Sequence, residues 1–248
     1  MKTDTENIGT FWDHLDELRG CLVRIAIVTI VFAIVVFFFK DELFQIVLAP
    51  KSSDFITYRF LHVPAFDIHL MNIGLTEQFM IHLKTALYVG LLLASPYMLY
   101  QIFRFISPAL YANEWKYAFG IVGSSYIMFI LGNLLNYFLI FPFTLKFLGT
   151  YQVSIDVANM LTLQSYMDTL FILSLTMGVI FELPVVTWIL GKMGLIDKHM
   201  MQQYRRHAIV LILIVAAIIT PTTDAFTLVI VSIPIWLLYE LSVLIVHS

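Results

Sequence analysis

Charged side chains inside long apolar runs are the residues of this sequence most able to do chemistry. Glu182 lies in the middle of an apolar run over about 166–190, and Lys84 lies near the start of another over about 79–103. An ionisable group in such a run is costly to bury and marks a candidate functional site. Two interpretations of Glu182 are open: a buried carboxyl hydrogen-bonded to a neighbouring helix, or a polar handle that faces a groove and binds a polar group of a partner or substrate helix. Pro184 follows two residues later and predicts a kink.

A second acidic group lies in the N-terminal amphipathic segment 10–21. Its apolar residues share one stripe at helical spacing, whereas Glu17 and two aspartates lie on the other face. This face is either the solvated side of an interfacial helix or a carboxylate patch that binds cations. Glu114 is a further acid, in the loop that follows the second apolar run.

The sequence offers no recognisable catalytic chemistry. Its seven histidines lack metal-site spacing, and neither a nucleophile–base arrangement nor a glycine-rich phosphate loop is present. The single cysteine, Cys21, excludes an intrachain disulfide. A net charge of −3 gives no reason to expect nucleic acid as a partner. We therefore expect no cofactor and no metal, and rank a membrane-embedded enzyme as the last of the functional hypotheses.

The elements that must position these residues are transmembrane helices. Hydrophobic residues make up 60% of the 248 and charged residues only 12%, against about a quarter charged in a soluble domain. We predict an all-α integral membrane protein with six transmembrane helices and a single membrane domain over 1–248. The first run reads as a retained span, because acids precede it where a signal peptide is basic. The six apolar runs are 22–39, about 79–103, 117–141, about 166–190, 208–220 and 226–246.

The last two runs are predicted to be short, because the fifth has about 13 residues and the sixth meets Glu240 after about 14. Each then covers about 20 Å of a hydrocarbon core about 30 Å thick. They form either one re-entrant hairpin or two short spans that thin the bilayer. The apolar loop 40–76 is expected to pack as an outer cap. Lys and Arg favour the side that holds the N-terminus, so both termini are expected in the cytoplasm.

Several motifs together resemble the TatC family, the core subunit of the twin-arginine protein translocase. The resemblance covers nearly the whole chain, and six spans with two short final helices also fit that family. The motifs are His14-Leu15-Asp16-Glu17-Leu18-Arg19, Ala49-Pro50, Phe105-Ile106-Ser107-Pro108-Ala109-Leu110 with Glu114, Phe141-Pro142, Phe181-Glu182-Leu183-Pro184, Ile219-Thr220-Pro221 with Asp224, and Leu238-Tyr239-Glu240.

The resemblance implies a protein that receives precursors whose signal peptides carry two adjacent arginines, and that recruits single-span partners of the TatA and TatB type. It also implies a homo-oligomer within a larger complex of the cytoplasmic (inner) membrane. Glu182 and Lys84 match intramembrane polar positions of the family. Without the resemblance, the same two residues could form a relay in a proton- or ion-coupled transporter of small solutes. The signal-peptide residues implied are Glu17, Glu114, His14, Arg19 and Phe105, and the expected structural turns are Pro50, Pro142, Pro221 and Asp224.

Overall fold

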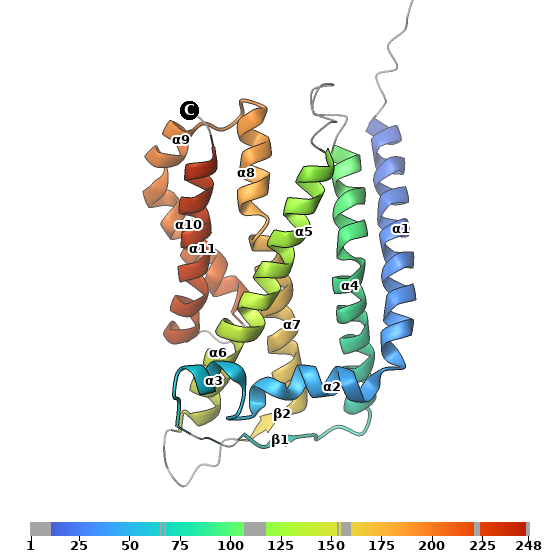
Figure 1. Ribbon diagram of the computed structural model, residues 1–248, viewed down its shortest axis with the longest axis vertical. Coiled ribbons are helices and arrows are strands. Elements are labelled where there is room, and N and C mark those ends of the chain that lie inside the picture. The colour runs from blue at the N-terminus through green and yellow to red at the C-terminus, as the bar shows by residue number, and fades with distance from the viewer. Residues whose placement is uncertain are drawn as a thin grey trace, which may run out of the picture.

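The protein is a bundle of long helices with a small helical cap at one end (Figure 1). Among the residues described, five helical segments are long and apolar enough to cross a membrane. The chain is therefore an all-α, multi-pass membrane protein. The structure, a computed structural model, describes residues 11–64, 66, 68–106, 118–152, 154, 160–220 and 224–246.

The first span is longer than its apolar run. Helix α1 (Phe11–Phe37) is continuous over 27 residues, so the amphipathic segment and the span are one helix. It packs along α4 (Glu77–Ile106), and the two backbones meet closely at Gly90. A Cβ atom there would lie 2.7 Å from the backbone nitrogen of Ala33, so only glycine permits this approach.

The third span does not end at its proline. Helix α5 (Ala118–Leu135) continues through a π-helical turn (Asn136–Ile140) into α6 (Phe141–Thr150). The turn expected at Pro142 is therefore wrong. Pro142 lies in the first turn of α6, directly after the π turn. The wider π turn lets the helix pass the proline without a break.

The fourth span is broken at the residue of greatest interest. Helix α7 (Leu163–Ile180) ends before Phe181 and Glu182, and α8 (Leu183–Lys192) begins after them. Pro184 lies in the first turn of α8, which explains the break because proline cannot donate into the preceding turn. Gly178, just before the break, packs against Phe129 of α5.

The last spans differ from each other in length. Helix α10 (Arg205–Ile219) has 15 residues and is preceded by the short α9 (Lys198–Gln203). Helix α11 (Ala225–Ile245) has 21 residues and continues through Glu240. The prediction of a short sixth helix is therefore wrong, because the charge of Glu240 is matched within the protein and does not end the helix.

The cap lies between α1 and α4 in the sequence. It contains α2 (Lys40–Leu48), a 3-10 turn (Ala49–Lys51) and α3 (Ile56–Phe60). Strand β1 (Leu70–Met71) then pairs in parallel with β2 (Leu161–Thr162), which precedes α7. The Tyr58 hydroxyl donates to the carbonyl of Pro142 at 2.8 Å, and burial raises the pKa of this phenol above its ordinary range.

Side-chain hydrogen bonds fasten the cap to the bundle from both directions. The Tyr166 hydroxyl donates to the carbonyl of Val47 at 2.9 Å, and the Tyr137 hydroxyl donates to that of Ile46 at 2.6 Å. The cap therefore rests on α6, α7 and the π turn as a fixed part of the fold. Figure 1 shows the start of α1, the end of α4 and the end of α11 at the opposite end of the bundle.

Candidate functional site

The end of the bundle opposite the cap presents the first group of candidate residues. Glu17, His14 and Arg19 are exposed on the first turns of α1. Glu17 makes no ion pair with any residue that the structure describes. Phe105 is half-buried at the last turn of α4, which packs beside α1 (Figure 1). Glu114 lies outside the described residues.

Glu182 has an unusual environment at the break in the fourth span. It occupies the N-cap position of α8 but makes no side-chain capping bond. The Ser125 side chain of α5 lies near its carboxylate. Its Oε1 atom is buried and has no partner among the described residues. The helix break thus holds a carboxylate with a buried acceptor oxygen that has no donor among the described residues.

A cavity of about 450 Å³ lies next to this break. It is formed between α5, α8 and α11, and Pro184 and Val185 line it immediately after Glu182. Nearly all of its lining is apolar, and Ser124, the neighbour of Ser125, contributes to its wall. An apolar cavity beside a partly satisfied polar group has the character of a helix-docking surface in a membrane.

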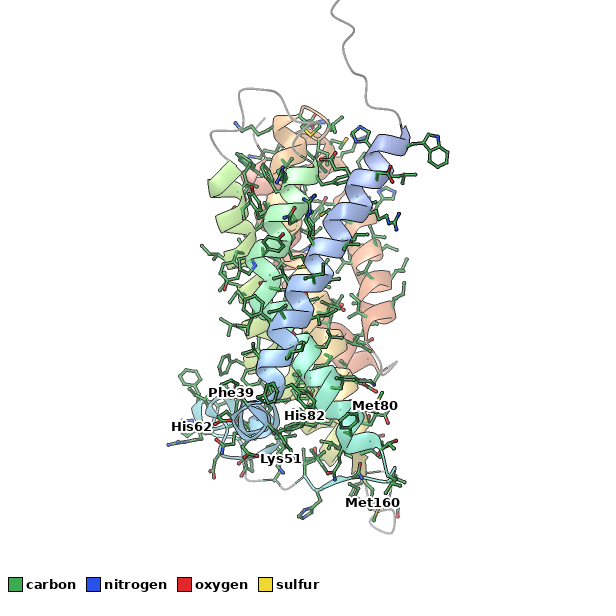
Figure 2. The ribbon with its side chains drawn as sticks, turned by 90° about the vertical axis from the view of Figure 1, so that its right-hand side faces the viewer. Phe39, Lys51, His62, Met80, His82 and Met160 are labelled. Atoms are coloured by element: carbon green, nitrogen blue, oxygen red, sulfur yellow. The ribbon has the colours of Figure 1, made fainter. Side chains whose placement is uncertain are left out.

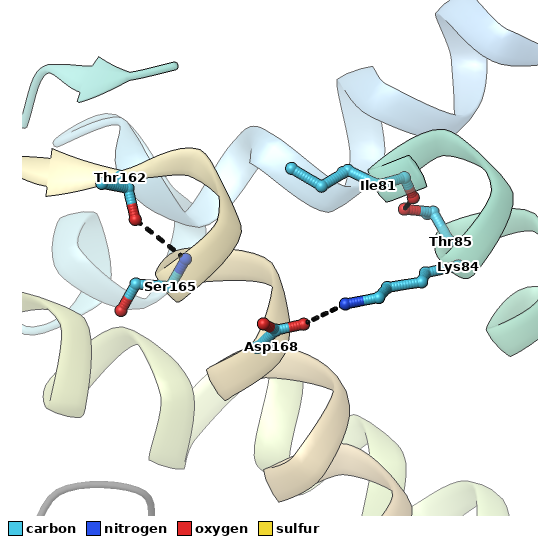
Figure 3. A network of polar contacts seen from close by, with 6 residues as sticks. All are labelled: Ile81, Lys84, Thr85, Thr162, Ser165 and Asp168. Carbon is cyan, nitrogen blue, oxygen red and sulfur yellow. Dashed lines mark hydrogen bonds and ion pairs between the residues drawn. The ribbon is translucent and has the colours of Figure 1, made fainter. Parts of the chain in front are cut away.

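Lys84 is not near Glu182. Its Nζ atom lies 3.1 Å from Oδ1 of Asp168 in α7 (Figure 3), and both side chains are partly exposed. Asp168 and Glu182 are about 14 residues apart on the same span, which corresponds to about 21 Å along a helix. The structure therefore does not bring Glu182 and Lys84 together, and a direct proton relay between them has no geometric basis.

Two polar contacts were missed by the reasoning from sequence. The first is the ion pair between Lys84 and Asp168. The sequence shows Asp168 only as a single acidic residue within an apolar run. The second joins α10 to α11, where Arg205 donates to Glu240 at 2.6 Å. The sequence showed Glu240 only as an interruption of the sixth apolar run, and the 35 positions between the two residues left no local signal of the pair.

The expected turn residues lie in different structural settings. Pro50 is buried in the 3-10 turn of the cap. Asp224 is the N-cap of α11, where its side chain accepts from the backbone N–H of Thr227 at 2.7 Å. Pro221 lies outside the described residues. Asp224 thus fixes the start of the last helix.

Comparison with known proteins decides the family. The family model described as Sec-independent protein translocase protein (TatC) matches residues 13–234. The chain belongs to the TatC family. TatC of Blattabacterium sp. subsp. Periplaneta americana is 33% identical over 98% of this chain and 96% of its own length. TatC of Aquifex aeolicus is 33% identical over 93% of this chain and 92% of its own length.

Solved structures support the same assignment. A crystal structure of the twin-arginine translocase receptor TatC superposes with a TM-score of 0.77 at 33% identity, covering 94% of this chain and 97% of that one. A second, in DDM, gives 0.80 at 32% identity over 95% and 100%. This TatC-family chain is thus a core subunit of the twin-arginine protein translocase and not an enzyme.

Proposed function

We propose that this chain receives signal peptides with two adjacent arginines at the end of the bundle opposite the cap. The observation that supports this most is the exposed Glu17 carboxylate, which has no basic partner among the described residues. Glu114 is the second proposed acceptor, and His14, Arg19 and Phe105 complete the proposed site. An accessible carboxylate on a rigid helix is suited to a guanidinium, because the two groups form paired hydrogen bonds.

The energies of such contacts are sufficient for reversible recognition. A fully exposed ion pair contributes about 0–1 kcal/mol. A charge-assisted hydrogen bond in a partly desolvated pocket contributes about 1.5–3 kcal/mol. Two of them supply a useful share of the roughly 8 kcal/mol of a micromolar complex. The apolar part of the signal peptide supplies the remainder.

Photo-crosslinking tests the proposal directly. A photoreactive residue at position 17 or 114 is expected to label a tagged peptide with two arginines, and less so a peptide with two lysines, because lysine cannot form the bidentate contact. Glu17→Ala combined with Glu114→Ala is expected to abolish labelling from a reporter at His14. Asp41→Ala combined with Glu42→Ala, which removes two exposed acids of the cap, is the charge-matched control. Undiminished labelling in the double variant would remove the recognition claim.

The finer topology is also a proposal. We infer six spans with both termini in the cytoplasm of a bacterium and the cap on the outer side of the inner membrane. Basic residues gather at the end opposite the cap, as the positive-inside rule requires. Helix α10 is then a sixth span of 15 residues, about 22 Å long, and the bilayer thins beside it. Depth labelling beside α10 that gives normal thickness would contradict this.

Glu182 is the proposed contact for single-span partners of the TatA and TatB type, with Lys84 as a second polar position on a different part of the surface. The free Oε1 atom and the adjacent cavity support this role. A coupled solute transporter is the alternative function. The separation of Glu182 from Lys84 counts against it. Solute uptake by vesicles that contain this chain alone would favour it.

A further inference from the structure

We propose that the cap is anchored in the lipid interface by an apolar edge, which we define as Ile46, Ile56 and Phe60. The ligand of this surface is the acyl-chain boundary of the leaflet on the cap side. All three side chains are exposed, and Phe60 is 82% exposed. Large apolar side chains that are exposed on one small cap indicate a binding surface or a membrane contact.

The level at which the cap meets the bundle supports lipid as the occupant. A bilayer core needs about 20 helical residues, so a span that starts at Gly120 reaches the far boundary near Ile140. The cap is fastened at this level, because Thr57 donates to the carbonyl of Phe138 and Tyr58 donates to that of Pro142. The cap thus lies beside the span at the membrane boundary.

The geometry of α3 directs its apolar side chains away from the protein. Tyr58 is 1% exposed and points to α6, whereas Ile56 and Phe60, four residues apart, lie on the opposite face of the helix. Exposed Arg59 lies between them in sequence, and exposed Lys51 precedes the helix. A short helix with apolar and basic side chains on its outer surface is typical of the lipid interface.

The apolar surface is also continuous with the surface of the first span. Phe38 and Phe39 follow α1 directly and are 80% and 56% exposed, and exposed residues of α1 itself precede them. Figure 2 shows α2 nearly end-on beside the bundle, with the labelled His62 on the side away from α4. Lipid that covers α1 therefore extends over Phe38 and Phe39 to the start of the cap.

Nitroxide labels test the depth of this edge. The single native cysteine is replaced as Cys21→Ser, and a spin label is attached to Ile56→Cys, Phe60→Cys or the control Asp54→Cys, which is also exposed. Each protein is placed singly in nanodiscs of phosphatidylethanolamine and phosphatidylglycerol. At positions 56 and 60, collision with oxygen is expected to exceed collision with a water-soluble nickel chelate, and at position 54 the order is reversed.

Two results would overturn the proposal. Preferential collision with the nickel chelate at positions 56 and 60 would place the edge in water. Low collision with both reagents would mean that the protein itself covers the edge and that lipid does not contact it. As a second measurement, Ile56→Ser combined with Phe60→Ser is expected to leave the melting temperature in detergent unchanged but to make the cap more accessible to protease in nanodiscs. Unchanged protection would also contradict anchoring.

Discussion

Substitution of Glu182 separates its contribution to folding from its contribution to partner binding. Glu182→Gln keeps the chain length, the acceptor for Ser125 and a polar group at the buried position. Glu182→Leu removes all three. Losing one hydrogen bond between membrane helices costs about 0.6 kcal/mol on average. Removing the buried, partnerless Oε1 atom recovers about 1–3 kcal/mol of desolvation. The leucine variant alone is therefore expected to melt at the same or a higher temperature.

Partner binding is expected to change in the opposite direction. A charge-assisted hydrogen bond to Oε1 contributes about 1.5–3 kcal/mol, which corresponds to about 10- to 150-fold in affinity. Glu182→Leu is therefore expected to lose TatA- and TatB-type partners on affinity purification by at least about tenfold, while Glu182→Gln retains more of them. Ser125→Ala is the matched control, since it removes the neighbour but leaves the carboxyl.

The measurements are thermal melting in detergent and partner recovery from the same preparation. A leucine variant that fails to fold would assign Glu182 a structural role. Full partner recovery with leucine would exclude it as a contact. Equal loss with Gln and Leu would show that ionisation, and not hydrogen bonding, is what the partner requires.

Three further outcomes are expected from other parts of the fold. A double-mutant cycle with Lys84→Met and Asp168→Asn should give a coupling of no more than about 1 kcal/mol, because both side chains are partly exposed; a much larger coupling would contradict this. Tyr58→Phe should cost about 1–3 kcal/mol by leaving a buried carbonyl without its donor. Because burial raises the pKa of Tyr58, the stability that this group contributes is present below pH 10 and lost as the pH rises above it, so the wild type should lose more stability at alkaline pH than the variant. Gly178→Val should lower stability by about 1–3 kcal/mol, since a Cβ would lie 2.7 Å from a ring carbon of α5, whereas Gly123→Ala meets nothing within 4 Å and should be neutral or stabilising.

The membrane class of the fold could be predicted because every residue in a span contributes to the same signal. Lipid admits only segments that satisfy their own backbone, so about 20 apolar residues indicate a helix. The positions of breaks were harder to predict. Pro142 and Pro184 have the same chemistry, yet the π turn carries the chain past the first, whereas the helix breaks before the second. Packing against neighbouring helices decides between these outcomes, and no local pattern records it.

Which charged residues form ion pairs could not be predicted from the sequence, for a related reason. Periodicity reports which face of a helix is apolar but not which helix lies opposite. Arg205 and Glu240 are 35 positions apart in the chain and Lys84 and Asp168 are 84 apart, so only the fold brings them into contact. The sequence alone therefore predicts that the apolar span ends at Glu240. In the structure, the ion pair with Arg205 of α10 allows α11 to continue past this residue.

The contrast among these charges carries the strongest argument about function. Burying a charge is tolerated when the protein supplies an opposite charge, and the spans do so for Lys84 and Glu240. Glu182 has no ion pair, and its Oε1 atom has no donor, among the described residues. Glu182 differs in this respect from Lys84 and Glu240, which have charged partners in neighbouring helices. The cost of keeping Glu182 there is explained if a polar group from another membrane helix completes its hydrogen bonds in the assembled translocase.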